Sequence, residues 1–401
     1  MNLSSIFKSG GAEKKEASQC LDLVVSPDSE LRDRVMEGYA IEGFGQPKVE
    51  SSLEAVREWA ESEHGARTLI LDLRYADAEQ LKEVVEAHTT QLDVQISVVI
   101  LGESDSIKLK NWVETQGARY VLWEGNVNGL IHNVGDLRRP GPATGSYKAR
   151  TAKRILVLGS KGGVGVSCVS SALVHLFSAK AGLPTLLVDH DNGAVSSDLY
   201  LGIEGLKIRQ NSSDLSHKEI DASIARTYLN RVNDRADCLM LESVNNCVGF
   251  HAPNLLELSR QLAQDYNFII DSVPSTLFDE VNDPGFAERY HRIYVVLDPS
   301  VSSLRAYNQL KSKLDKVPHR VIVNQSRPNG DYALTMADAL DKLKMESAIS
   351  LGYEAGLEKG LIQKGHSFIE SKKLLRSLAT IVDELAGKRI YGGGRLRWLS
   401  R

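Results

Sequence analysis

The stretch Ile155-Leu-Val-Leu-Gly-Ser160-Lys161-Gly162-Gly163-Val164-Gly165-Val166-Ser167-Cys168 decides the fold of this 401-residue chain. Its apolar start, Ile155 to Leu158, breaks into a glycine-rich turn, and residues Ser167 to Ser178 can then form a helix. When a strand, a loop and a helix follow one another in this way, the backbone N–H groups of the loop and of the helix N-terminus point at an anion. The stretch therefore predicts a phosphate-binding loop in an α/β domain.

The loop is similar to the deviant Walker A pattern, K-G-G-x-G-K-[ST], with one departure. Val166 stands where the pattern has the lysine that reaches the β- and γ-phosphates. The glycines permit a tight turn and a close approach of backbone to phosphate, and Ser167 keeps the hydroxyl that contacts Mg²⁺ in such loops. The residues expected to bind a nucleotide here are Lys161, Gly162, Gly163, Val164, Gly165, Val166, Ser167 and Cys168.

Composition and charge are those of a soluble globular protein. Hydrophobic residues make up 42% of the chain and charged residues 25%, and the net charge of −4 gives no general attraction for nucleic acid. The sequence contains no apolar run near the ~20 residues needed to cross a bilayer, and residues 1–18 form a polar leader without the apolar core of a secretory signal. We therefore expect a cytoplasmic protein of two domains that binds no nucleic acid. Buried free thiols are expected at Cys20, Cys168, Cys238 and Cys247.

Before the loop, apolar runs alternate with amphipathic segments, which is typical of a parallel sheet covered by helices on both faces. The expected strands are residues 20–25, 68–73, 95–101 and 118–123, with a weaker one near Lys48. The expected helices are residues 28–39, 51–62 and 77–87. Ser26 or Asp28 can cap the first of these helices. A linker with two prolines and two glycines, residues 136–150, separates this domain, residues 19–135, from the second.

Residues 19–135 resemble a response-regulator receiver domain, which has a flavodoxin-like fold. The resemblance places Asp72 at the position of the phospho-accepting aspartate. Gly102 stands where a receiver has Thr or Ser, Trp123-Glu124 stands where it has Lys, and only Asp28 remains of the acidic cluster. A phosphoryl group on Asp72 would lack metal-binding acids and a counter-charge. The resemblance therefore implies a vestigial acceptor and a docking or dimerising role.

Two acidic motifs follow the phosphate-binding loop. The first, Pro184 to Asp191, is an apolar strand whose acids Asp189 and Asp191 lie on the same side of an extended chain. The second, Tyr266 to Pro274, is an apolar strand that ends in Asp271. Strand-end acids that occur alone are often only solvated, whereas their place after a phosphate-binding loop indicates a functional role.

The loop and the two acidic motifs, in this order, resemble a MinD/ParA-type P-loop ATPase of the SIMIBI class, here over residues 151–387. The resemblance implies a second doubly wound parallel sheet, with ATP and Mg²⁺ as cofactors. It implies that Ser167 and Asp191 hold Mg²⁺, that Asp191 also positions the attacking water in any remaining catalysis, and that Asp271 holds Mg²⁺ through a water molecule. It further implies that Lys161 reaches across a homodimer to the partner's nucleotide, and that Asn324 reads the adenine edge.

The chain closes with an amphipathic helix and a basic tail. The helix, residues 371–387, carries an apolar stripe that we expect to pack on the sheet. The tail, residues 388–401, combines three glycines with Arg395, Arg397, Arg401 and Trp398. Such a tail can touch an anionic surface, so that peripheral membrane contact, a partner contact and disorder all stay open.

Loss of the loop lysine bears on catalysis more than on binding. Its ammonium normally neutralises phosphate charge as the phosphoryl group is transferred, and removal of one such stabiliser slows a reaction on the order of hundreds-fold. The glycines, Ser167 and the acids remain. The hypothesis is therefore a nucleotide-binding, dimerising module whose ATP hydrolysis is slow or absent.

From about residue 19 onward, an atypical receiver followed by a MinD/ParA-like domain resembles the TadZ/CpaE group of type IV (Tad/Flp) pilus assembly proteins. The resemblance implies a scaffold at a cell pole, peripheral to the inner membrane, that recruits the pilus secretion machinery including its secretion ATPase. The alternative is an active MinD/ParA-type ATPase that positions DNA, flagella or division machinery. A third interpretation is an output regulator controlled by phosphorylation of Asp72.

Overall fold

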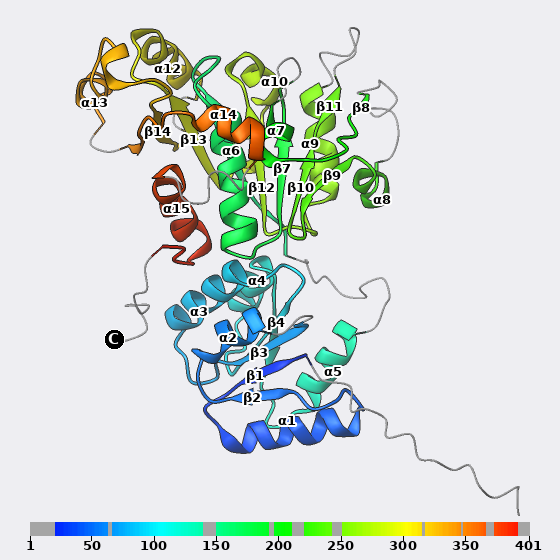
Figure 1. Cartoon of the computed structure of the whole chain (residues 1–401). Coiled ribbons are helices and arrows are strands. Elements are labelled where there is room, and N and C mark those ends of the chain that lie inside the picture. The colour runs from blue at the N-terminus through cyan, green and yellow to red at the C-terminus, as the bar shows by residue number, and fades with distance from the viewer. Residues whose placement is uncertain are drawn as a thin grey trace, which may run out of the picture. The chain divides into compact units, whose positions relative to one another are not determined.

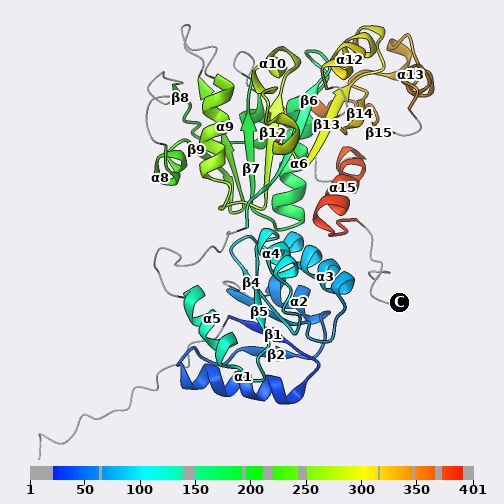
Figure 2. The same ribbon diagram turned by 180° about the vertical axis from the view of Figure 1, so that it is seen from behind.

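A computed structural model describes residues 21–62, 66–138, 150–191, 196–210, 220–242, 251–314, 317–345, 348–365 and 373–391. These residues form two compact units (Figures 1 and 2). The first comprises the described residues up to Glu86 together with Gln95 to Arg138, and the second comprises Ala87–Val94 and the described residues from Arg150 onward. The expected leader, linker residues 139–149 and the tail from residue 392 lie outside the described residues.

The first unit is built on a parallel sheet in the order β2-β1-β3-β4-β5. Its strands are β1 (Leu23–Val25), β2 (Lys48–Glu50), β3 (Thr68–Asp72), β4 (Ser97–Gly102) and β5 (Ala118–Leu122). This is the strand order of the flavodoxin-like fold. All five expected strands are present, including the weak one at Lys48.

Five helices cover the two faces of the first sheet (Figure 1). They are α1 (Ser29–Ile41), α2 (Ala55–Ser62), α3 (Ala78–Gln91), α4 (Ile107–Thr115) and α5 (Asn128–Arg138). Side chains of α1 and α5 share one core cluster with Val24, Ile70 and Val99 of the strands. Asp28 caps α1 by accepting the N–H groups of Glu30 and Leu31, as the sequence predicted.

The second unit is built on an eight-stranded sheet in the order β15-β14-β13-β6-β12-β7-β10-β9, in which only β9 runs antiparallel to its neighbour. The strands are β6 (Lys153–Gly159), β7 (Thr185–Asp189), β9 (Leu229–Asn233), β10 (Ala236–Leu239), β12 (Phe268–Val273), β13 (Arg292–Leu297), β14 (Arg320–Asn324) and β15 (Ile349–Leu351). The short strands β8 (Arg209–Gln210) and β11 (Leu241–Glu242) pair separately. Two doubly wound parallel-sheet units, the fold expected from the sequence, are thereby confirmed.

Helices lie on both faces of the second sheet (Figures 1 and 2). One face carries α6 (Val166–His175) with its π-helical continuation Leu176–Lys180, α7 (Ser197–Leu201), α14 (Leu357–Lys364) and α15 (Lys373–Ala386). The other carries α8 (Ala222–Arg226), α9 (His251–Gln261), α10 (Phe278–Val281), α11 (Phe286–Arg289), α12 (Val301–Leu314) and α13 (Met336–Leu343).

The apolar stripe of α15 is buried in the same core cluster as α6, which confirms that this helix packs on the sheet. The buried members of the stripe are Leu374, Leu375, Leu378, Ile381, Val382 and Leu385. Removing this much apolar side chain from water is a major stabilising contribution to the unit. Within the described ranges, no helix combines the length and the apolar character that crossing a bilayer requires.

Cys238 is a buried free thiol, as expected, whereas Cys168 is a free thiol that is only partly buried by its accessible surface. Burial raises the pKa of the Cys168 thiol to about 12 and that of Cys238 well above its ordinary value. Neither group is therefore a thiolate near neutral pH, which fits a packing role and no reactive one. The expected thiols at Cys20 and Cys247 lie outside the described residues.

Candidate functional site

The glycine-rich turn between β6 and α6 consists largely of glycine backbone, and no side chain of the N-cap residue caps α6. Gly163 and Gly165 adopt φ angles of 74° and 94°, in the left-handed region that favours glycine. Gly165 is the N-cap residue of α6 and, having no side chain, makes no side-chain cap bond to that helix. A Cβ atom added at Gly162 or Gly163 would meet no described atom within 4 Å. The turn therefore leaves free space at Gly162 and Gly163 beside the N-terminus of α6, a position at which backbone N–H groups can hold an anion.

Val166, which replaces the loop lysine, packs inward. Its side chain contacts the core cluster beneath α6. A Cβ atom on Gly159 would lie only 2.8 Å from its Cγ2 atom, so the valine lies directly against the end of β6. The position that would supply an ammonium group to a bound phosphate supplies a methyl group to the core.

Asn324, the last residue of β14, supports the loop from the side. Its Nδ2 group donates a hydrogen bond of 2.8 Å to the carbonyl of Val164. A Cβ atom at Gly165 would lie 2.4 Å from the same Nδ2 atom, so only glycine fits there. The amide hydrogen that was expected to read an adenine edge is thus engaged with the loop backbone in this structure.

Lys161 lies beside an acid that sequence reasoning did not single out. Its Nζ atom is 3.4 Å from Oδ2 of Asp298, which follows β13 directly and has a side chain 3% exposed. Asp298 is held in turn by the start of α12, because its N–H donates to Ser303 Oγ at 3.0 Å and its Oδ1 accepts the Ser300 hydroxyl. The sequence signal was available, since an acid directly after a strand parallel to β6 must lie at the same edge of the sheet.

The acids at the end of β7 differ in environment. Asp189, the last strand residue, is 1% exposed, and burial raises its pKa to about 6. Its Oδ1 accepts the N–H of Asp191 at 3.1 Å. Asp191 is half-buried just beyond the strand, and residues 192–195 lie outside the described residues. The expected metal and catalytic residue therefore lies at the carboxyl edge of the sheet, while Asp189 belongs to its interior.

Asp271 does not lie with the loop. It pairs with Leu156 in the sheet, and because neighbouring residues of a strand point to opposite faces, it shares the face of Leu156 and Leu158, opposite α6. Arg154 donates to both of its oxygens, at 2.5 and 3.1 Å, and Nε2 of His190 lies 2.7 Å from Oδ1. The resemblance implied that Asp271 holds Mg²⁺, but in this structure its carboxylate oxygens are bonded to Arg154 and His190 instead.

The charge of Asp271 is compensated within the protein. Burial alone would raise the pKa of this carboxyl, but the Arg154 charge and the bonds from His190 and Arg154 hold it well below its usual range. The side chain is fully buried, and that of Arg154 is 10% exposed. Arg154 and Asp271 thus form a buried ion pair that joins β6 to β12 on the face of the sheet opposite α6.

In the first unit, the expected vestigial acceptor Asp72 ends β3 and is buried. Its oxygens accept hydrogen bonds from Arg74 and from the Ser26 hydroxyl. Gly102 also has a packing reason, because a Cβ atom there would lie 2.4 Å from the hydroxyl of Tyr120. The Tyr120 ring therefore lies directly against Gly102, and its hydroxyl donates to the carbonyl of Ser104 at 2.8 Å.

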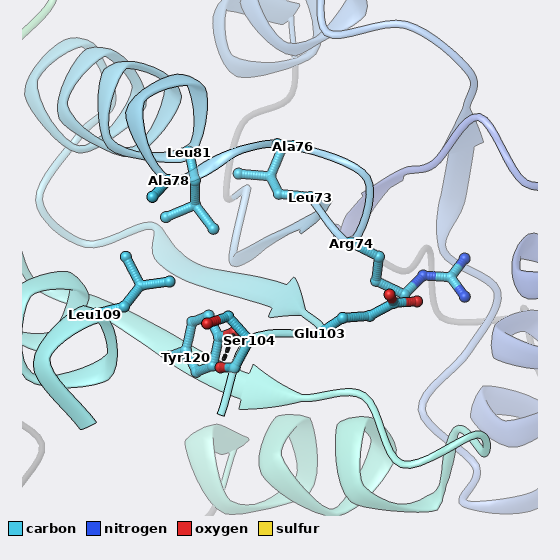
Figure 3. Close-up of a pocket in the computed structure, with 9 residues that line it drawn as sticks. All are labelled: Leu73, Arg74, Ala76, Ala78, Leu81, Glu103, Ser104, Leu109 and Tyr120. Carbon is cyan, nitrogen blue, oxygen red and sulfur yellow. Dashed lines mark hydrogen bonds between the residues drawn. The ribbon is translucent and has the colours of Figure 1, made fainter. Parts of the chain in front are cut away.

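A cavity of about 320 Å³ opens beside these residues, between the connections that follow β3 and β4 (Figure 3). It is lined by Leu73, Arg74, Ala76, Ala78, Leu81, Glu103, Ser104, Leu109 and Tyr120. Figure 3 shows the Arg74 side chain at its edge, pointing away from the apolar floor. The cavity therefore lies next to Asp72 through Arg74, but Asp72 is not one of its lining residues.

No protein-family model matches this chain. Among solved structures it is similar to a ParA family ATPase from Chlorobium tepidum TLS, with 20% identity and a TM-score of 0.47 over 58% of this chain and 99% of that one. It is also similar to the septum site-determining protein MinD complexed with Mg-ADP from Pyrococcus horikoshii OT3, with 18% identity, a TM-score of 0.48, and 59% and 98% coverage. A chain of the MinC:MinD cell division protein complex from Aquifex aeolicus shows 21% identity, a TM-score of 0.45, and 61% and 99% coverage. The likeness is one of fold.

Proposed function

We propose that the second unit binds ATP with Mg²⁺ and that the chain acts as a dimerising scaffold whose ATP hydrolysis is slow or absent. One observation carries the proposal: α6 begins at a glycine without a side-chain cap, beside an open glycine turn, while the partly buried Val166 side chain packs against the core. The turn can hold phosphate groups through backbone N–H donors. The side chain that would stabilise their transfer is missing.

Phosphate and metal would be held by different parts of the site. The N–H groups of the turn and of α6 would hold the phosphates, and Ser167, the second residue of α6, would hold Mg²⁺ with Asp191. Asp271 can contribute only if it exchanges its bonds with Arg154 and His190. The metal site of this chain therefore rests mainly on Ser167 and Asp191.

Lys161 is the remaining cation of the loop, and Asp298 shares its charge in the isolated chain. A phosphate that enters the turn brings a second anion within reach of Lys161, and this competition favours release of the lysine from Asp298. A released Lys161 is then available to the nucleotide of a second copy, as expected for a dimer of MinD/ParA type.

The role of such a dimer is proposed from the order of the two units. An atypical receiver-like unit before this nucleotide-binding unit supports a TadZ/CpaE-type scaffold for pilus assembly at a cell pole. Its partners would be the pilus secretion machinery, including the secretion ATPase, with peripheral membrane contact through the basic tail. We propose that nucleotide binding controls assembly of the scaffold and that ATP hydrolysis drives no further step.

Light scattering of the purified chain, with and without Mg·ATP, tests this function. The proposal predicts a monomer without nucleotide and a dimer with Mg·ATP, and it predicts that Lys161→Ala removes the dimer while fluorescent ATP still binds. Partner-stimulated hydrolysis at a steady rate would favour the active positioning ATPase instead. Failure to bind ATP at all would reject both.

A further inference from the structure

Arg74 lies at the carboxyl edge of the first sheet, against two carboxylates from different segments. Its Nε and Nη2 groups donate to the two oxygens of Asp72 at 2.8 and 2.9 Å, and Nη2 also donates to Oδ2 of Asp28 at 2.8 Å. The Arg74 side chain is 5% exposed and that of Asp72 is 1% exposed. A buried guanidinium thus joins the loop after β1 to the end of β3.

The two carboxyl groups that Arg74 contacts also accept hydrogen bonds from a hydroxyl and from the backbone. Ser26 Oγ donates to Oδ2 of Asp72 at 2.6 Å, and Oδ1 of Asp28 accepts the N–H of Glu30 at 2.9 Å. The hydrogen bond from Arg74 is the main reason that the pKa of Asp28 lies below its ordinary value. Asp28 therefore favours its carboxylate form beside Arg74.

Two aromatic rings complete the seat of the guanidinium. The Trp123 ring lies 4.7 Å from Cζ of Arg74, and the Tyr75 ring lies 5.2 Å from it. A flat guanidinium can stack on rings while its edge forks a carboxylate, which neither an ammonium nor a metal ion can do. The sequence around Asp72 is therefore fitted to an arginine.

The cluster of Arg74, Asp28 and Asp72 lies where sheets of this topology bind ligands. The sheet order 2-1-3-4-5 reverses direction between β1 and β3, and ligands of such sheets bind at that point, beyond the carboxyl ends of the strands. Two acidic side chains, Asp28 and Asp72, converge there on one cation. Two carboxylates and a hydroxyl, completed by water, form an oxygen set that suits Mg²⁺ or Mn²⁺.

We propose that Arg74 is a built-in cation that permanently occupies a divalent-cation site formed by Asp28, Asp72 and Ser26. The first unit then keeps one charge state whatever the metal concentration, and Asp72 stays closed to modification because its oxygens are bound. Arg74 also lines the neighbouring cavity. The charge at the rim of that cavity therefore does not change with the metal concentration. This inference concerns the first unit alone and does not depend on nucleotide binding by the second.

Removal of Arg74 tests the inference through a gain of binding. We would measure Mn²⁺ binding by electron paramagnetic resonance and thermal unfolding in Mn²⁺ or EDTA, on the nucleotide-free full chain. Wild type should show the same Tm in both solutions. Arg74→Ala should unfold at least about 5 °C lower in EDTA, recover part of that loss in Mn²⁺, and bind one more Mn²⁺ per chain than wild type.

The double variant Arg74→Ala/Asp72→Asn is the matched control and should lose the additional Mn²⁺. Arg74→Lys keeps a charge at the site and should gain none. If Arg74→Ala does not fold, Arg74→Gln keeps the side-chain stem under Trp123 without its charge and should show the same additional Mn²⁺. A folded Arg74→Ala or Arg74→Gln chain with no more Mn²⁺ than wild type, or a double variant that keeps the gain, would overturn the proposal.

Discussion

Nζ of Lys161 lies 3.4 Å from Oδ2 of Asp298, so the only cationic side chain within the glycine-rich turn faces an acid of its own chain. Asp298 is almost fully buried and is fixed by two serines of the following segment. The acid of this pair is therefore buried and hydrogen-bonded, whereas the lysine is partly exposed. Since the lysine side chain is 30% exposed, solvent screens part of the attraction, and the contact is weak enough for a phosphate to replace it.

The first prediction concerns this pair. Asp298→Asn removes an anion from the edge of the phosphate site and frees Lys161, so Mg·ATP should bind about threefold to tenfold more tightly, which corresponds to roughly 1 kcal/mol. Titration with a fluorescent ATP analogue measures the change. The double variant Asp298→Asn/Lys161→Ala should lose the gain, and an unchanged affinity in the single variant would show that the pair does not oppose binding.

The second prediction restores the missing charge. Val166→Lys should raise the rate of ATP hydrolysis about a hundredfold or more, because an ammonium at the start of α6 can stabilise charge on the transferred phosphoryl group. Its aliphatic stem can keep part of the contact with Gly159. Val166→Met matches the stem without the charge and should leave the rate at its original level. Equal rates in the two variants would contradict the role given to this position.

The third prediction tests the support of the loop by Asn324. Gly165→Ala places a Cβ atom 2.4 Å from Nδ2 of Asn324 in a residue whose φ is 94°, so it should destabilise the chain by at least about 1–2 kcal/mol and weaken ATP binding. Thermal unfolding and nucleotide titration measure both effects. Gly162→Ala is the matched control for stability, because its Cβ atom meets open space, and its Tm should equal that of wild type.

The fourth prediction concerns acid stability. The pKa of Asp271 is lowered in the folded state, so the Arg154–Asp271 pair stabilises the protein above about pH 4, the ordinary range of an aspartate, and this stabilisation is lost as the pH falls below it. Asp271→Asn should therefore cost about 3–5 kcal/mol at neutral pH, and less at pH 3. Chemical unfolding across this pH range measures the difference.

Asp189 provides the opposite case within the same unit. Burial raises its pKa to about 6, so the stability of the fold declines as the pH rises from about 4 to about 6 and stays lowered above that range. Asp189→Asn should therefore be neutral or stabilising at pH 7. A loss of stability in Asp189→Asn equal to that in Asp271→Asn would contradict the assignment of opposite environments to the two acids.

Much of the fold could be predicted because its central strands are continuous apolar runs. The expected strands at residues 68–73 and 95–101 overlap β3 and β4, since strands buried on both faces must be apolar along their length. The hairpin of β9 and β10 was not predicted. β9 lies at the edge of the sheet and contains exposed Arg231 and two asparagines, so it lacks the apolar signal.

The sequence indicates where the candidate site residues lie along the chain, but not which side chains they contact. The spacing of the loop indicates an anion site wherever it occurs, because the effect depends on local backbone. By contrast, Arg154 and Asp271 are 117 residues apart in sequence, and nothing in either motif indicates that they pair. The same holds for Arg74, because its contacts with Asp28 and Asp72 form only when the pairing of β1 with β3 brings these two acids together.

Release of phosphate from γ-labelled ATP by the purified chain, measured over many hours with Mg²⁺ present, tests the central claim most directly. The account predicts that the nucleotide recovered from the protein is still ATP and that phosphate release stays near the background rate, while ATP binding is readily detected. Steady multiple turnover that Asp191→Ala abolishes would contradict it.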